Sequence, residues 1–290
     1  MNTRSSQNGQ SKIYEMITDR IIDQLEKGVI PWVKPWACGY HKNYVSKKPY
    51  RGINAFLLGC SGYNSPYWLT FKQVQDNKGK IIKGEKGTPV IFWKIYEKKE
   101  TNNASVDENK VSIPVLRYYT IFNLDQCEGL KVSQEDQREF QPISEAEQIV
   151  QNMPYRPRID HNESKAYYNP TSDFINLPKT GLFFSDEEFY STLFHEMIHS
   201  TGHKTRLNRH KEQKDHHFGS KDYSKEELIA EMGSAFLCGY CGIEQKTIKN
   251  QSAYIQSWLE VFHSDKKILI NAAAKAQKAT DYILNNTVNI

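Results

Sequence analysis

Residues 195–199 read His195-Glu196-Met197-Ile198-His199, and this run decides the fold expected for the second half of the chain. Two histidines four residues apart project from the same face of a helix, close enough to bind one metal ion. The glutamate between them can reach a water molecule on that metal and act as its general base. The run therefore predicts a metal site with His195 and His199 as ligands and Glu196 as the base.

The residues around this run predict the helix that carries it. Residues 184–194 have the apolar spacing of a helix, Ser185 and Glu188 form a capping-box pattern, and Gly202 is a natural stop. A five-residue pattern with two free positions also recurs by chance, and the alternative is a core or solvated helix that carries two histidines. The capping signals favour the first interpretation, with the run late in a helix of about four or five turns.

A catalytic zinc usually takes a third protein ligand, and residues 223–237 predict a second helix that offers one. Glu227 and Glu231 lie four residues apart on it. Because buried carboxylates are costly without a cation, we expect Glu227 to bind the metal and Glu231 to accept the free N–H of a histidine. Alternatively, Glu227 closes a capping box with Ser224. The third ligand would then be Glu231 or one of the histidines between the two helices: His203, His210, His216 and His217.

The composition is that of a folded enzyme without a membrane partner. The chain has 290 residues, of which 38% are hydrophobic and 12% aromatic, enough for two packed domains. No stretch approaches the ~18 apolar residues of a membrane span, and the polar start is unlike a signal peptide. Five cysteines without framework spacing indicate a reducing compartment, so we expect a cytoplasmic location. Cys238 and Cys241 are expected to be small core residues.

Charge divides the chain into two parts. Residues 1–131 carry 20 Lys and Arg against 12 Asp and Glu, whereas residues 132–290 carry 18 against 22. Four of the five tryptophans also lie in the first part. A polar run separates the two, and we expect a domain at 1–131, a linker at 132–142 and a second domain at 143–290.

The first part predicts a mixed helix and strand domain. Ile13, Ile17, Ile21 and Leu25 repeat every four residues, which predicts a helix that ends before Gly28. Short helices are expected at 52–59 and from Thr70. Two segments rich in β-branched and aromatic residues, Thr88–Glu97 and Val111–Asn123, predict strands with a polar loop, Lys98–Lys110, between them.

Aromatic and basic residues alternate in this first part, which is typical of proteins that bind single-stranded nucleic acid. Flat rings stack on unpaired bases while cations follow the phosphates. The alternative is a small domain whose tryptophans are core residues and whose lysines are merely solvated. The candidate DNA-binding residues are Trp32, Trp36, Lys47, Lys48, Tyr50, Arg51, Lys83 and Lys86.

These features occur within motifs that run through nearly the whole chain. In the first part they include Tyr50-Arg51-Gly52-Ile53-Asn54, Trp68-Leu69-Thr70-Phe71-Lys72-Gln73 and Lys83-Gly84-Glu85-Lys86-Gly87-Thr88-Pro89-Val90. In the second they include Ala166-Tyr167-Tyr168-Asn169-Pro170, the histidine run through His203, Arg206-Leu207-Asn208-Arg209, and Glu226-Glu227-Leu228 with Glu231. With these motifs in one order, the chain resembles the ArdC family of antirestriction proteins, which are carried on conjugative plasmids and other mobile elements.

The resemblance implies an α+β protein of two domains, an N-terminal single-stranded-DNA-binding domain and a C-terminal zincin-like domain related to the Spartan-type DNA-linked proteases. It favours Glu227 over Glu231 as the third ligand of a Zn2+ ion, although another divalent transition metal would fit the same donors. DNA-bound proteins are the expected substrates.

The segment 167–177 is expected to supply the edge strand that receives a substrate peptide, and Tyr168 is a candidate for polarising its carbonyl. Two other functions stay open. One is a binding-only antirestriction protein whose metal is structural, and the other is a regulatory protease that cleaves a repressor.

Overall fold

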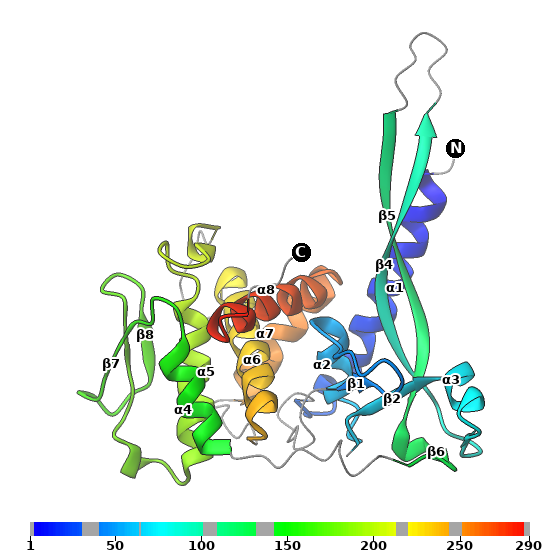
Figure 1. Ribbon diagram of the computed structural model, residues 1–290. Coiled ribbons are helices and arrows are strands. Elements are labelled where there is room, and N and C mark those ends of the chain that lie inside the picture. Colours follow the sequence, from blue (N-terminus) through cyan, green and yellow to red (C-terminus); the bar gives the residue numbers. More distant parts are fainter. Residues whose placement is uncertain are drawn as a thin grey trace.

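The fold was analysed in a computed structural model, which describes residues 3–30, 41–63, 65–100, 109–131, 142–212, 220–243 and 251–286. Sheets and helices are mixed in both halves of the chain, which confirms the expected α+β class. Figure 1 shows the two halves side by side, with a long hairpin rising from the N-terminal half. Among the described residues, no helix is both long enough and apolar enough to cross a bilayer.

The N-terminal half is built around a four-stranded sheet with the strand order β1-β2-β5-β4. Its long edge is a two-stranded antiparallel ribbon, β4 with β5. The elements of this half are α1 (Thr3–Glu26), β1 (Lys42–Asn43), α2 (Ile53–Gly59), β2 (Tyr67–Thr70), α3 (Phe71–Asp76), β3 (Lys80–Ile81), β4 (Thr88–Glu100), β5 (Asn109–Asn123) and β6 (Cys127–Glu128).

The elements expected in this half are confirmed, with one correction. Ile17, Ile21 and Leu25 of α1 are fully buried, as the four-residue repeat predicts. The loop expected at Lys98–Lys110 is shorter, because β4 continues to Glu100 and β5 begins at Asn109. Backbone pairing in the ribbon carries these polar residues into the strands even though their side chains do not have the strand pattern.

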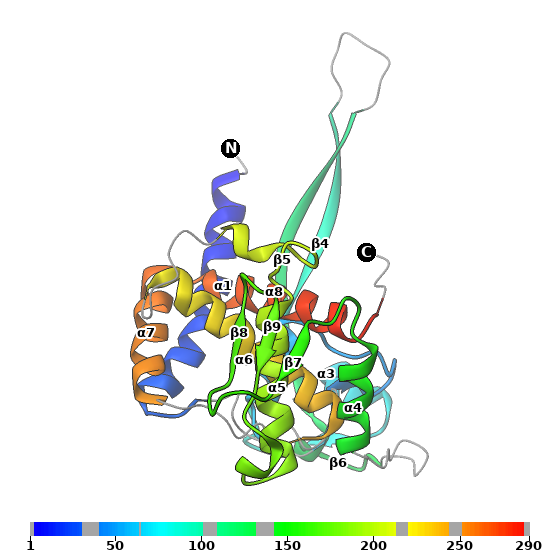
Figure 2. The same cartoon turned by 90° about the vertical axis from the view of Figure 1, so that its left-hand side faces the viewer.

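The C-terminal half is mainly helical. A three-stranded sheet with the order β7-β9-β8 lies in front of α5 and α6, as Figure 2 shows. The elements are α4 (Pro142–Asn152), β7 (Arg158–Asp160), β8 (Tyr167–Asn169), β9 (Phe174–Asn176), α5 (Asp186–Ser200), α6 (Lys221–Cys241), α7 (Gln251–Ser264) and α8 (Ile268–Ile283). Cys238 and Cys241 are buried within α6, as expected of core residues.

The two halves share one hydrophobic core. Helix α1 packs against α7, and α2 packs against α8, so that residues of all four helices belong to a single buried cluster. Polar contacts cross the same boundary: Thr18 Oγ1 donates to the Lys266 carbonyl at 2.7 Å, and the Gly52 amide donates to Gln277 Oε1 at 2.8 Å. The halves are therefore packed together rather than tethered only by their connection.

Candidate metal centre

Helix α5 places His195 and His199 one turn apart. At the start of the helix, the Ser185 hydroxyl accepts a hydrogen bond from the Glu188 amide. Acidic residues in the first turn interact favourably with the positive end of the helix dipole. His195 and His199 then project together, with their Nε2 atoms 3.1 Å apart. The expected helix and its cap are therefore present, and it brings two nitrogen donors to one point.

Helix α6 adds a carboxylate to the same point. Glu227 Oε2 lies 3.6 Å from His195 Nε2, and Glu227 Oε1 lies 3.5 Å from His199 Nε2. Ligands about 2.0–2.1 Å from a tetrahedral zinc are separated by about 3.3 Å. The three distances therefore fit one small divalent ion. Among the residues that the structure describes, His195, His199 and Glu227 form the one metal-binding group of this kind.

A close helix crossing makes this arrangement possible. Gly233 of α6 faces Ile198 of α5, and a Cβ atom at Gly233 would lie 2.5 Å from Ile198 Cδ1. A glycine therefore lets the two helices approach until Glu227 meets the histidine pair.

Each histidine has a carboxylate at its other ring nitrogen. His195 Nδ1 lies 3.3 Å from Glu231 Oε1, and His199 Nδ1 lies 3.3 Å from Glu226 Oε1. Such contacts fix the ring orientation of metal-binding histidines and raise their basicity. Glu231 lies at the second ring nitrogen of a histidine, as expected, whereas helical spacing in the sequence does not predict the contact made by Glu226.

Glu226 is also half of a buried ion pair. Arg209 Nη2 and Nε lie 2.5 and 2.9 Å from its two oxygens, and Arg209 Nη1 also donates to Thr201 Oγ1 at 2.8 Å. Burial alone would raise the pKa of Glu226, but the Arg209 guanidinium outweighs it and holds that pKa well below its usual range. Arg209 thus ties the loop after α5 to the metal-facing side of α6.

The capping alternative for Glu227 is wrong. Helix α6 begins earlier than that alternative requires, with Ser220 as its cap, so Ser224 lies inside the helix. Burial opposes ionisation of Glu227, but His199, His195 and a hydrogen bond from Tyr223 lower its pKa to about 2. Glu227 is therefore an anionic donor.

His203 and His210, two of the other candidate ligands, contact acidic side chains instead of joining the three donors. His203 Nδ1 is 3.7 Å from Asp173, and His210 Nε2 is 3.6 Å from Glu226. Gly202 permits the second contact, because a Cβ there would overlap the His210 ring. His216 and His217 lie outside the described residues.

Glu196 lies beside the three metal donors, in a cleft of about 530 Å3. Its carboxyl group is buried, which raises its pKa, and it accepts a hydrogen bond from the Tyr168 backbone amide. Strand β8, which carries Tyr168, forms one wall of the cleft, and His210 and Tyr223 line it as well. A base, a strand edge and three metal donors therefore face one space.

The Tyr168 hydroxyl has other partners. It donates to Asp173 Oδ1 at 2.8 Å and accepts from Arg206 Nη2 at 3.2 Å. Burial and Asp173 raise its pKa. This hydroxyl would have to give up its bond to Asp173 before it could donate to a substrate carbonyl, so the polarising role stays a prediction.

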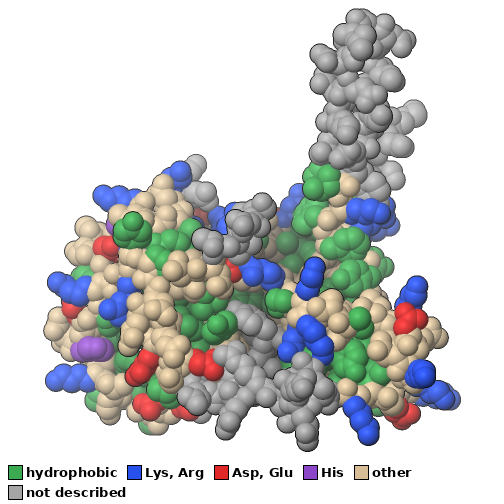
Figure 3. Space-filling model, viewed as in Figure 1, with side chains coloured by type: hydrophobic (Ala, Val, Ile, Leu, Met, Phe, Trp, Pro, Cys, Tyr) green, Lys and Arg blue, Asp and Glu red, His purple; other side chains and the backbone are tan. Residues whose placement is uncertain are grey.

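The candidate DNA-binding residues are spread over the N-terminal half. Lys47, Lys48, Lys83 and Lys86 are exposed, and Figure 3 shows Lys and Arg to be more frequent than Asp and Glu on this half. Lys47 Nζ also lies over the ring of Tyr67, at 4.7 Å. Of the remaining candidates, Tyr50 is partly buried and Arg51 is paired with Asp281 of α8. Trp32 and Trp36 lie outside the described residues.

Family models match both halves. Residues 11–122 match the N-terminal domain of the anti-restriction factor ArdC, and residues 144–275 match a zincin-like metallopeptidase domain. The crystal structure of the antirestriction protein ArdC from plasmid R388 is similar over 94% of this chain and 97% of that one, with a TM-score of 0.77 and 35% sequence identity. Its Mn(II)-bound form is also similar, with a TM-score of 0.73, 35% identity and coverage of 96% and 98%.

Two kinds of sequence relative cover nearly all of this chain. The protein y4eC of Sinorhizobium fredii is 32% identical over 98% of the chain and 95% of its own length. A DNA primase TraC of Escherichia coli is 34% identical over 93% of the chain, but the chain spans only 27% of that protein's length.

Proposed function

The chain belongs to the ArdC family of antirestriction proteins, and on that premise we propose that it binds single-stranded DNA of an incoming mobile element in the cytoplasm and carries a zinc-dependent peptidase. We assign residues 1–131 to DNA binding and residues 143–290 to the peptidase. The observation that carries the peptidase proposal is the triangle of His195, His199 and Glu227 with Glu196 beside it.

The residues of the cleft suit the hydrolysis of a peptide bond. A zinc ion held by the three donors would lower the pKa of a water molecule and withdraw electrons from the substrate carbonyl. Glu196 accepts a proton from the attacking water as the new C–O bond forms. It then returns a proton to the amine nitrogen as the C–N bond breaks.

Strand β8 supports an extended peptide as the substrate. Within the described residues, β8 pairs with β9 on one side and forms the outer edge of its sheet. The same strand lines the cleft beside Glu196. A peptide added to this edge would gain backbone hydrogen bonds and pass the metal donors.

Proteolysis of the full-length protein with and without single-stranded DNA tests the proposal. DNA should stimulate cleavage, including self-cleavage, because binding on one strand raises the effective concentration of protein targets near the cleft. Glu196→Gln should abolish cleavage while retaining metal and DNA binding. Glu260→Gln, an exposed change on α7, serves as the control.

Cleavage that persists in the Glu196→Gln variant would remove Glu196 from the mechanism. No cleavage by either protein, with antirestriction intact, would favour the binding-only function.

A further inference from the structure

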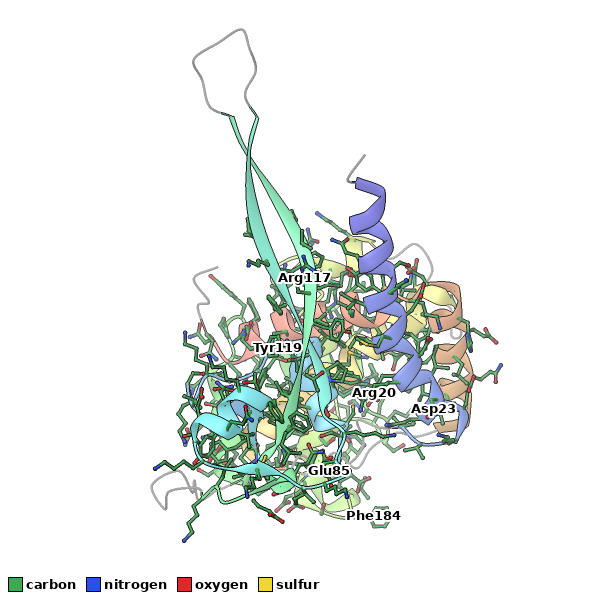
Figure 4. The ribbon with its side chains drawn as sticks, turned by 90° about the vertical axis from the view of Figure 1, so that its right-hand side faces the viewer. Arg20, Asp23, Glu85, Arg117, Tyr119 and Phe184 are labelled. Atoms are coloured by element: carbon green, nitrogen blue, oxygen red, sulfur yellow. The ribbon has the colours of Figure 1, made fainter. Side chains whose placement is uncertain are left out.

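The β4–β5 hairpin exposes large aromatic side chains. Phe92 is 38% exposed, Trp93 51%, Tyr118 52% and Tyr119 39%, all within a short stretch of the two strands. The hairpin rises from the N-terminal half, and the part of it that carries Arg117 and Tyr119 lies beside α1, as Figure 4 shows. Clustered exposed aromatic side chains of this kind indicate an interaction surface.

Strand register sorts these side chains onto two faces. Phe92 is opposite Arg117, Lys94 is opposite Val115, and Val90 is opposite Tyr119. Directly opposed residues of an antiparallel pair point to the same side, and successive residues alternate. One face therefore combines two aromatic rings with two exposed cations. The other face holds Trp93, Ile95, Leu116 and Tyr118 and has no charged residue among residues 90–95 and 114–119.

The face that carries Lys94 and Arg117 continues onto the body of the N-terminal half. The rings of Phe92 and Tyr119 are 5.3 Å apart, and Tyr50 packs on the cluster that contains Val90 at the base of the same face. Tyr119 is near enough to contribute to the raised pKa of Tyr50. We name Tyr50, Phe92, Lys94, Arg117 and Tyr119 the aromatic-basic face. Figure 4 shows where Arg117 and Tyr119 lie on β5.

We propose that the aromatic-basic face binds single-stranded DNA, with unpaired bases stacked on Phe92 and Tyr119 and phosphates paired with Lys94 and Arg117. This inference rests on the proposed DNA-binding function and locates its site. Stacking requires bases that are free of a duplex, and cations beside the rings match the phosphates that join those bases. The opposite face has comparable rings but no such cations, so charge distinguishes the two.

Two neighbouring tyrosines provide a matched test in the full-length protein. Tyr118 and Tyr119 are adjacent on β5, comparably exposed, and on opposite faces. Binding of a fluorescent oligothymidylate of about 16 nucleotides is measured by anisotropy. Tyr119→Ala should weaken binding roughly 5- to 150-fold, the range for loss of one stacked base. Tyr118→Ala should leave it within about twofold, and Tyr119→Phe should retain the affinity because it retains the ring.

The salt dependence separates stacking from charge. Arg117→Gln should lower the slope of log affinity against log salt concentration by about 0.7, the contribution of one phosphate of a single strand. Tyr119→Ala should leave that slope unchanged.

Equal losses in the Tyr118 and Tyr119 variants, or none in either, would overturn the site while the DNA-binding function stood. Equal affinity of the wild type for duplex would overturn the stacking proposal, and no binding of oligothymidylate by the wild type would overturn the proposed DNA-binding function itself.

Discussion

Glu226 and Glu231 both contact a histidine ring on α5, but their surroundings differ. Glu226 also accepts two hydrogen bonds from the buried guanidinium of Arg209. Glu231 is buried beside His195, and burial raises its pKa even though His195 opposes that shift. Removing the charge of Glu226 therefore leaves the buried Arg209 cation without its carboxylate partner, whereas His195 still has Glu227 at 3.6 Å when Glu231 loses its charge.

This difference predicts unequal effects on folding. Glu226→Gln should lower the free energy of unfolding by about 3–5 kcal/mol, the usual result of breaking one side of a buried ion pair. Glu231→Gln, which removes a similar carboxylate from the same helix, should lower it by less. Urea denaturation of the full-length protein in the presence of a chelator measures both. A larger loss in the Glu231 variant would contradict the assigned partners.

The sequence alone predicts part of this site. Helical spacing was enough to bring His195 and His199 together and to place Glu227 and Glu231 on one face of the next helix. The contribution of Arg209 was not predictable, because it depends on how the loop after α5 folds back over the helix. Helical periodicity does not predict the role of Glu226, because this residue directly precedes Glu227 and is expected on a different face of the helix.

At the scale of elements, the crossing of α5 and α6 determines whether the donors meet. Gly233→Ala would normally stabilise a helix interior by about 0.5–1 kcal/mol. Here the added Cβ would overlap Ile198, so we expect a loss of about 1–3 kcal/mol, as for other overpacked contacts. Metal affinity should fall with it, because the helices must separate.

A double-mutant cycle checks this explanation. Ile198→Val removes the Cδ1 atom nearest to the added methyl group. The double variant should therefore be less destabilised than the sum of the two single variants, as measured by chemical denaturation. Simple additivity would mean that this contact does not limit the approach of the helices.

The main elements followed from the sequence because each has a strong local pattern: the four-residue repeat of α1, the cap of α5 and the β-branched runs of the hairpin. The length of the hairpin could not be predicted from the sequence, because its polar outer part is paired through backbone hydrogen bonds and lacks the side-chain pattern of a strand. The two faces of the hairpin also required the observed register, because a shift of one residue would exchange them.

At the scale of the whole molecule, the shared core predicts that both halves unfold together. Ile21 of α1 is 1% exposed and belongs to the cluster that continues through α7 and α8. Ile21→Ala should cost about 2–5 kcal/mol and should lower hydrogen-exchange protection in α6 and β5 by the same amount. Unchanged protection in α6 would show that the halves are independent. The charge asymmetry predicted two functional parts, but it contained no information on their packing.

The whole proposal depends on whether His195, His199 and Glu227 hold one divalent metal ion. Metal content of the full-length protein after dialysis is measured by elemental mass spectrometry for the wild type, His195→Ala, Glu227→Ala and the surface control Glu260→Gln. We predict about one zinc per chain in the wild type and in Glu260→Gln, and loss of the metal from both ligand variants. Full metal content in His195→Ala and Glu227→Ala would contradict this site.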